Sequence, residues 1–68
     1  MFLNLITELK RHNITRVFVA QKLGIDVNTL NNKIYGKTDF KLTEVNKILE
    51  LFPNTSIDYL FKKEKQNK

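Results

Sequence analysis

The sequence predicts an all-α fold of five short helices in one compact domain, and three observations support that prediction. Apolar residues recur at helical spacing in several segments, and no alternating run is long enough to indicate a strand. Two glycines and one proline separate these segments, as expected for short connections. At 68 residues, the chain has room for one small core and none for a separate catalytic or ligand-binding domain.

The first helix is expected over residues 2–12. Its apolar residues repeat at i, i+3, i+4 and i+7 on one face, at Phe2, Leu5, Ile6 and Leu9. Basic residues fill its last turn, where cations interact favourably with the negative end of the helix dipole. Asn13 follows and is expected to adopt a positive φ, because asparagine tolerates that conformation better than most residues.

The second helix is expected to begin after Thr15 and to end at Leu23. Thr15 is a good N-cap, because its hydroxyl oxygen can accept from a free amide of the first turn. Val19, Ala20 and Leu23 form the predicted buried face. Gly24 stands where the helix must stop and the chain must turn, a position that commonly requires positive φ.

The third helix is expected over residues 27–35, between Asp26 as its N-cap and Gly36 as its end. Leu30 and Ile34, at i and i+4, form its inward pair. The polar residues predicted to lie on its other faces are Asn28, Asn31, Asn32 and Lys33.

A loop over residues 37–41 precedes the fourth helix, which Thr43 is expected to open. The helical apolar repeat reappears in this segment at Val45, Ile48, Leu49 and Phe52. Pro53 is expected to close the helix, because proline disfavours a helical conformation in the residue before it.

A short fifth helix is expected to run through residue 61. Ser56 or Thr55 can cap it, and Ile57 and Leu60 are predicted to be buried. The compact domain therefore covers residues 1–61. Residues 62–68 contain no apolar anchor and are expected to form a basic, flexible C-terminal tail.

The charge balance limits the classes of partner. Twelve Lys and Arg against seven Asp and Glu give a net charge of +5, which favours nucleic acid or an anionic membrane surface. The longest apolar run, residues 17–20, is far shorter than the roughly 20 residues that span a bilayer. No signal-peptide pattern is seen at the start. We therefore expect a soluble cytoplasmic protein without a membrane partner.

Catalytic and metal chemistry find little support in the residue types. The chain has no cysteine, and its one histidine, His12, has no accompanying carboxylate cluster in the sequence. The one serine, Ser56, has the spacing of a helix cap. We expect no enzyme activity, no metal site and no cofactor.

The turn glycine and the residues around it follow a recognisable pattern. The matching positions are Thr15, Ala20, Leu23, Gly24, Ile25, Thr29, Leu30, Gly36 and Lys37. In these positions residues 15–37 resemble the lambda-repressor-like (Cro/XRE) helix-turn-helix family. The resemblance extends to the count of five helices, and the segments 33–45 and 58–61 are similar to small phage-encoded regulators of that family. Arg16, Phe18 and Val27 depart from the usual family residues, so no relative's base preference can be copied.

The resemblance implies that the third helix enters the DNA major groove with its N-terminal half leading. The implied base-reading residues are Val27, Asn28, Asn31 and Asn32. Asparagine can pair with adenine N6 and N7, and valine methyl groups suit the thymine methyl, so we expect A·T pairs at contacted positions. Asparagine is a mediocre helix former, which argues against a face selected for stability alone. A solvated helix face is the competing interpretation.

Phosphate contacts are expected around both ends of this helix pair, where they position the reader without specifying sequence. The expected residues are Arg16, Gln21, Lys33, Tyr35, Lys37, Thr38 and Lys41. The leading functional hypothesis is therefore a sequence-specific, double-stranded DNA-binding transcription regulator, of the phage Cro-like or repressor type. Two-fold dimers of such a protein would read paired half-sites about one helical turn apart.

Two apolar groups leave a second functional class open. Val17 and Phe18 lie outside the predicted buried face, so they either pack on the first helix or the loop near Phe40, or contact another protein. Tyr59 and Phe61 could supply a further protein or dimer contact. The alternative function is a protein-interaction module, such as an antitoxin or anti-repressor, built on the same helices.

Overall fold

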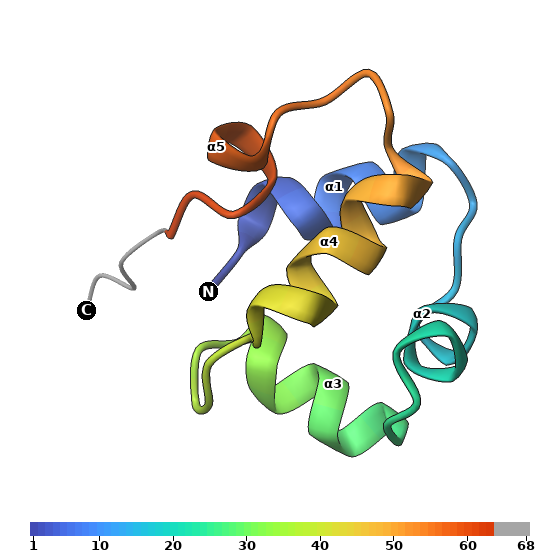
Figure 1. Cartoon of the computed structure of the whole chain (residues 1–68), viewed down its shortest axis with the longest axis vertical. Coiled ribbons are helices and arrows are strands. Elements are labelled where there is room, and N and C mark those ends of the chain that lie inside the picture. Colours follow the sequence, from blue (N-terminus) through green and yellow to red (C-terminus); the bar gives the residue numbers. More distant parts are fainter. Residues whose placement is uncertain (64–68) are drawn as a thin grey trace.

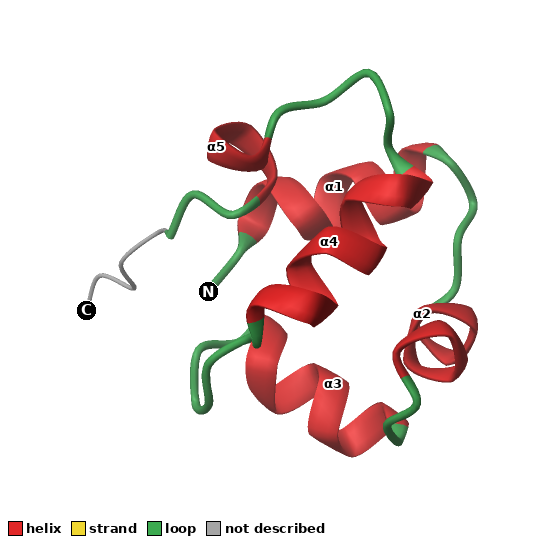
Figure 2. Ribbon diagram, in the orientation of Figure 1, coloured by secondary structure: helices red, strands yellow, loops and turns green. Residues whose placement is uncertain are grey.

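The computed structural model describes residues 1–63 and contains five α-helices and no strand in that part of the chain (Figures 1 and 2). The helices are α1 (Leu3–Arg11), α2 (Arg16–Leu23), α3 (Val27–Ile34), α4 (Leu42–Leu51) and α5 (Ile57–Leu60). The predicted all-α fold with five helices is confirmed. Each helix ends within one or two residues of its predicted bounds.

One hydrophobic core joins all five helices. α2 packs against both α3 and α4, and α1 packs against α5. Leu30 and Ile34 of α3, Ile48 of α4 and Leu60 of α5 have no solvent-exposed surface. The other buried apolar residues are Phe2, Leu5, Leu9, Val19, Ala20, Leu23 and Phe52. Burial of this set on one side of each helix leaves the opposite sides free for binding.

Local sequence signals set the angle between α2 and α3. The Thr15 hydroxyl oxygen accepts from the Phe18 amide at 3.1 Å and thereby caps α2. Gly24 ends α2 with φ of 75°, a left-handed conformation that costs residues with a Cβ roughly 1 kcal/mol or more. The Ile25 amide then donates to the Ala20 carbonyl at 3.0 Å, which closes the turn. The start of α3 is therefore held at a fixed direction from α2, as Figure 1 shows.

An aromatic cluster closes the end of the molecule that holds both termini of the described chain. The rings of Phe2, Phe40 and Phe61 lie 5.3 to 5.6 Å apart in tilted or edge-on contacts. The Phe2 amide also donates to the Ile34 carbonyl at 2.9 Å, which ties the start of α1 to the end of α3. This contact fixes the far end of α3 as the Gly24 turn fixes its beginning.

Three details differ from the sequence-based expectation. Helix α4 begins at Leu42, with Lys41 as its N-cap, rather than after Thr43. Ile57 is 44 % exposed and not buried, and Leu60 is the buried residue of the four-residue helix α5. The predicted basic tail begins at Lys62 and Lys63, which are exposed, and the rest of it lies outside the described residues.

Candidate nucleic-acid interface

Helix α3 presents one polar stripe to solvent because its opposite side is buried. Asp26 caps the helix by accepting from the Thr29 amide at 2.7 Å, and this hydrogen bond lowers the pKa of the Asp26 carboxyl. Leu30 and Ile34 hold the inner side in the core. Asn28 and Asn32, four residues apart, are exposed on the outer side. The exposed polar side chains are therefore carried by a helix that the core holds in place.

The other two predicted base-reading residues have different surroundings. Val27 is half-buried and packs against the core, so only part of its side chain faces outward. Asn31 is also half-buried, and its Oδ1 atom accepts a hydrogen bond from Arg16 Nη1 at 2.8 Å. The predicted base-reading residues therefore differ in their surroundings. Two asparagines are exposed, Asn31 is hydrogen-bonded to Arg16, and Val27 packs partly against the core.

Arg16 connects the beginning of α2 to the second half of α3. Besides Asn31, its Nη1 atom donates to the Tyr35 hydroxyl oxygen at 3.1 Å, and its Cζ atom lies 5.4 Å from the centroid of the Tyr35 ring. The sequence indicated a phosphate contact for Arg16 and gave no sign of these partners. They become visible only when α2 and α3 pack together.

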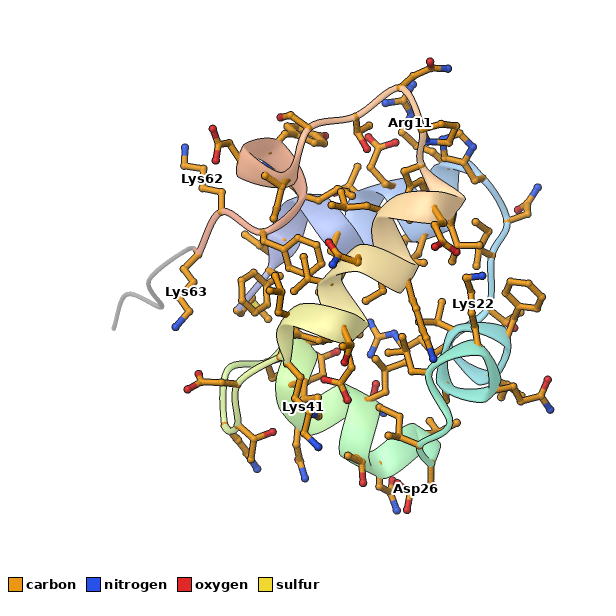
Figure 3. The ribbon with its side chains drawn as sticks, viewed as in Figure 1. Arg11, Lys22, Asp26, Lys41, Lys62 and Lys63 are labelled. Atoms are coloured by element: carbon orange, nitrogen blue, oxygen red, sulfur yellow. The ribbon has the colours of Figure 1, made fainter. Side chains whose placement is uncertain are left out.

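The loop after α3 carries exposed cations beside this stripe. Lys37, Thr38 and Lys41 are exposed, and Figure 3 shows Lys41 extending from the start of α4 into solvent. The backbone amides of Lys37 and Thr38 both donate to the Asn32 carbonyl, at 2.8 and 3.3 Å. These hydrogen bonds tie the loop to the end of α3, so the cations keep a set position relative to the asparagines.

Lys33 does not lie on a solvent face, and that prediction is wrong. Its side chain is 9 % exposed, and its Nζ atom lies 2.8 Å from Glu44 Oε1 and 3.3 Å from the Asp39 carbonyl. The Lys33 ammonium group, which was expected to contact a DNA phosphate, is therefore paired with the Glu44 carboxylate. The ion pair instead fixes α3 to the start of α4 and to the loop between them.

Glu44 is a supporting residue that the sequence analysis missed. Its Oε1 atom also accepts from the Lys41 backbone amide at 2.9 Å, which helps to begin α4. Burial acts to raise the pKa of Glu44, but the hydrogen bonds from Lys33 and from Lys41 outweigh it and leave this pKa below its ordinary value. The signal available in the sequence was the spacing of Lys41 and Glu44, which places a glutamate at the third position of the helix.

The remaining predicted contact residues lie on other parts of the surface. Gln21 is exposed on α2, and Val17 and Phe18 are 54 % and 50 % exposed. Phe18 lies beside Asn13, Ile14 and Thr15, whereas Phe40 belongs to the aromatic cluster with Phe2 and Phe61. Phe61 is therefore partly buried within the molecule.

A further polar cluster on α1 and α5 was not expected from the sequence. Glu8 is 3 % exposed, and its Oε2 atom accepts from the Tyr59 hydroxyl and from Arg11 Nη1, both at 3.0 Å. His12 Nε2 lies 3.3 Å from the other Glu8 oxygen, and its ring packs edge-on against Phe52. Tyr59, predicted as a protein contact, thus uses its hydroxyl to fasten α5 to α1.

Two properties of the described part of the chain, residues 1–63, bear on membrane and metal binding. No helix there has the length and apolar character needed to cross a membrane. No group of three or more His, Cys, Asp or Glu residues there could hold a metal ion.

Comparison with known proteins assigns the chain to a family. The sequence profile of the helix-turn-helix family matches residues 5–60, which include all of α2 and α3 and most of the domain. No curated protein and no solved structure matches the chain significantly. The profile covers the capped α2, the Gly24 turn and the outward-facing α3 in one alignment. The chain therefore belongs to the Cro/C1-type helix-turn-helix family of DNA-binding regulators.

Proposed function

We propose that this protein binds double-stranded operator DNA in a sequence-specific manner, with α3 in the major groove. The observation that carries this proposal is the outer stripe of α3. Asn28 and Asn32 are exposed on a helix whose inner side, at Leu30 and Ile34, has no solvent contact. An α-helix fits the major groove, where asparagine can hydrogen-bond to adenine N6 and N7. A rigid helix with exposed amides is suited to reading base edges.

The exposed lysine and threonine side chains of the loop after α3 would supply the part of the DNA affinity that does not depend on base sequence. Lys37, Thr38 and Lys41 flank the end of α3 and would contact phosphate oxygens, together with Tyr35 and Gln21. Among residues 1–63, no carboxylate oxygen lies within ion-pair distance of the Lys37 or Lys41 ammonium group, although the charge of Glu44 attracts Lys41 from further away. Both charges are therefore available to replace counterions along the DNA backbone.

Salt dependence tests this phosphate contribution. The double variant K37A/K41A is expected to reduce the slope of log affinity against log salt by about 2 units, because each phosphate neutralised contributes roughly 0.9. Fluorescence anisotropy titrations of a labelled duplex at several salt concentrations measure that slope. Lys10→Ala, which removes an exposed cation from α1, is the matched control and should leave the slope unchanged. A wild-type affinity that does not respond to salt would contradict the proposal.

The biological setting proposed for this activity is repression in the cytoplasm of a host cell. The protein would act by occupying an operator that overlaps a promoter, as a phage Cro-like or repressor-type regulator. A homodimer would place two copies of α3 in successive major grooves, about one helical turn apart. Activation through a polymerase contact on the same fold is the competing outcome, and a promoter reporter distinguishes the two signs of regulation.

One observation favours a second candidate function, a protein contact through α2. Val17 and Phe18 are half exposed, and Phe18 lines a shallow pocket of about 340 Å³ with Asn13, Ile14 and Thr15. Such a surface would suit an apolar segment of a protein regulator, as in an antitoxin or anti-repressor.

Phe18→Ala separates the two functions. Because half of the ring is already in solvent, we expect the variant to lose only about 1 kcal/mol of stability and to bind DNA as the wild type does. In a promoter reporter, loss of regulation with retained DNA binding would establish the protein contact. Unchanged regulation would exclude it, and thermal unfolding checks the fold of the variant.

A further inference from the structure

The contacts of Arg16 give one nitrogen atom two fixed acceptors on α3. Nη1 of an arginine carries two hydrogens and no lone pair for accepting. In this structure Nη1 donates to Asn31 Oδ1 at an N···O distance of 2.8 Å and to the Tyr35 hydroxyl oxygen at an N···O distance of 3.1 Å. The guanidinium also lies against the Tyr35 ring, with Cζ 5.4 Å from its centroid. Three contacts therefore hold Arg16 against the outer side of α3.

This arrangement fixes the orientation of the Asn31 amide. An arginine can only donate, so the amide must turn its oxygen toward Arg16, and its Nδ2 group must point the other way. Rotating the amide by half a turn would set two donors against each other. Asn31 is half-buried, which further limits its rotation. The free group of Asn31 is consequently a pair of N–H donors.

We propose that Arg16 is a positioning residue for base recognition, which holds Asn31 so that its Nδ2 group faces the DNA bases. This inference rests on the proposed function. It replaces the phosphate contact expected from the sequence with a role that acts through another residue. It also separates Asn31 from Asn28 and Asn32, whose side chains have no hydrogen bond to any residue between 1 and 63.

The exposed donors of Asn31 imply a definite base preference. In the major groove, guanine presents N7 and O6 as acceptors, adenine presents N7, and thymine presents O4. Cytosine presents only the N4 amino group, which is a donor. A fixed Nδ2 group can therefore bond to three of the bases and is repelled by cytosine. The expected signature is exclusion of cytosine at one position of the binding site.

Tyr35 is oriented by the same contact. Its hydroxyl oxygen accepts from Arg16, so its own hydrogen is free to donate, and the side chain is 43 % exposed. A phenol in this state suits a phosphate oxygen. The half-buried Arg16 thus leaves Asn31 of α3 and Tyr35, the C-cap of α3, with free donors, which suit the many hydrogen-bond acceptors on the surface of DNA.

The test compares in vitro selection of random duplexes by the wild type and by Arg16→Met, which keeps an unbranched side chain and removes every donor. We expect the wild type to disfavour cytosine by about tenfold or more at one position. In R16M the Asn31 amide can rotate and accept from cytosine N4, so the bias should fall below about threefold at that position alone. Circular dichroism and thermal unfolding check that the variant folds.

Two further variants identify the route of the effect. N31A should lose the same bias, and R16M/N31A should lose no more than N31A alone, since residues acting as a unit are not additive. K37M is the matched control, because it also removes one cation. It should lower the affinity for all DNA sequences and reduce the slope of log affinity against log salt, while the selected DNA motif stays the same.

The possible outcomes separate this inference from the proposed function. A relaxed preference at the single Asn31-dependent position in R16M supports the positioning role. If R16M selects the wild-type motif at every position and only binds more weakly, as K37M does, Arg16 is a phosphate contact and the inference is overturned. If the wild type itself enriches no motif, the proposed function fails and this inference fails with it.

Discussion

Replacing Asn28 and Asn32 together by alanine is expected to lower affinity for the specific DNA site by about 100-fold, because each well-placed amide contributes roughly 1–3 kcal/mol of discrimination. Both side chains are exposed and make no hydrogen bond within residues 1–63, so their loss leaves no buried group unsatisfied. Alanine is the better helix former, so α3 should be at least as stable in the variant. The loss should therefore appear in binding and not in folding.

Anisotropy titrations with the selected duplex and with a scrambled duplex measure this effect. The variant should keep the wild-type affinity for the scrambled duplex, since the phosphate contacts of the loop remain, and should prefer the selected duplex only by the smaller amount that Asn31 and Val27 contribute. Asn46→Ala, which removes an exposed asparagine from α4, is the matched control and should keep the wild-type preference. If the double variant still discriminates between the duplexes as the wild type does, the outer stripe of α3 does not read bases.

The second large effect is expected in folding stability, from Glu44→Ala. This change leaves the Lys33 ammonium, whose side chain is only 9 % exposed, without its carboxylate at 2.8 Å. Breaking a fully buried ion pair costs about 3–5 kcal/mol, and we expect about 2–3 kcal/mol here because both side chains keep some solvent contact. For a domain of this size the melting temperature should fall by roughly 10 °C or more. Thermal unfolding followed by circular dichroism measures the change.

The double variant K33M/E44L is the control for this result. Replacing both charges by apolar side chains removes the stranded ammonium, so most of the lost stability should return. If E44A unfolds at the wild-type temperature, the pair does not hold α3 to α4. If K33M/E44L is as unstable as E44A, the effect comes from something other than an unpaired charge.

The same pair predicts how stability depends on pH. The pKa of Glu44 is lower in the folded protein than its ordinary value, so folding is favoured by the ionised carboxylate. The contribution of Glu44 is therefore fully present above its unfolded pKa and is lost as the pH falls through its folded pKa. Glu8 and Asp26, whose pKa values are also lowered, add to the same acid-side loss. Glu44→Gln should show a weaker decline of stability across this acid range than the wild type.

The features that the sequence predicted well depend on short-range interactions. The caps at Thr15 and Asp26 and the positive φ of Asn13 and Gly24 each involve residues within four positions of one another. The buried pair of Leu30 and Ile34 follows from helical periodicity alone. The fold and the direction of α3 were therefore accessible before any tertiary contact was known.

The features that the sequence did not predict depend on contacts between helices. Lys33 stands three residues after Leu30, so helical spacing places it on the inner side of α3, and only its charge led to the expectation of a solvent position. Its burial depends on Glu44, which lies eleven residues further along the chain and pairs with its ammonium group. The contact of Arg16 with Asn31 spans fifteen residues and requires the packed angle between α2 and α3. Both residues were expected to contact phosphates on the grounds of charge alone, which carries no information about an internal partner.

Selection of bound DNA from a random duplex library, at about 150 mM salt, tests the central claim most directly. The wild type is expected to enrich one motif whose contacted positions include A·T pairs for Asn28 and Asn32. If the protein binds as a dimer, the motif should repeat as an inverted pair about 10 base pairs apart. Recovery of sequences with no shared motif, or of a motif with only G·C pairs at every contacted position, would contradict base reading by α3.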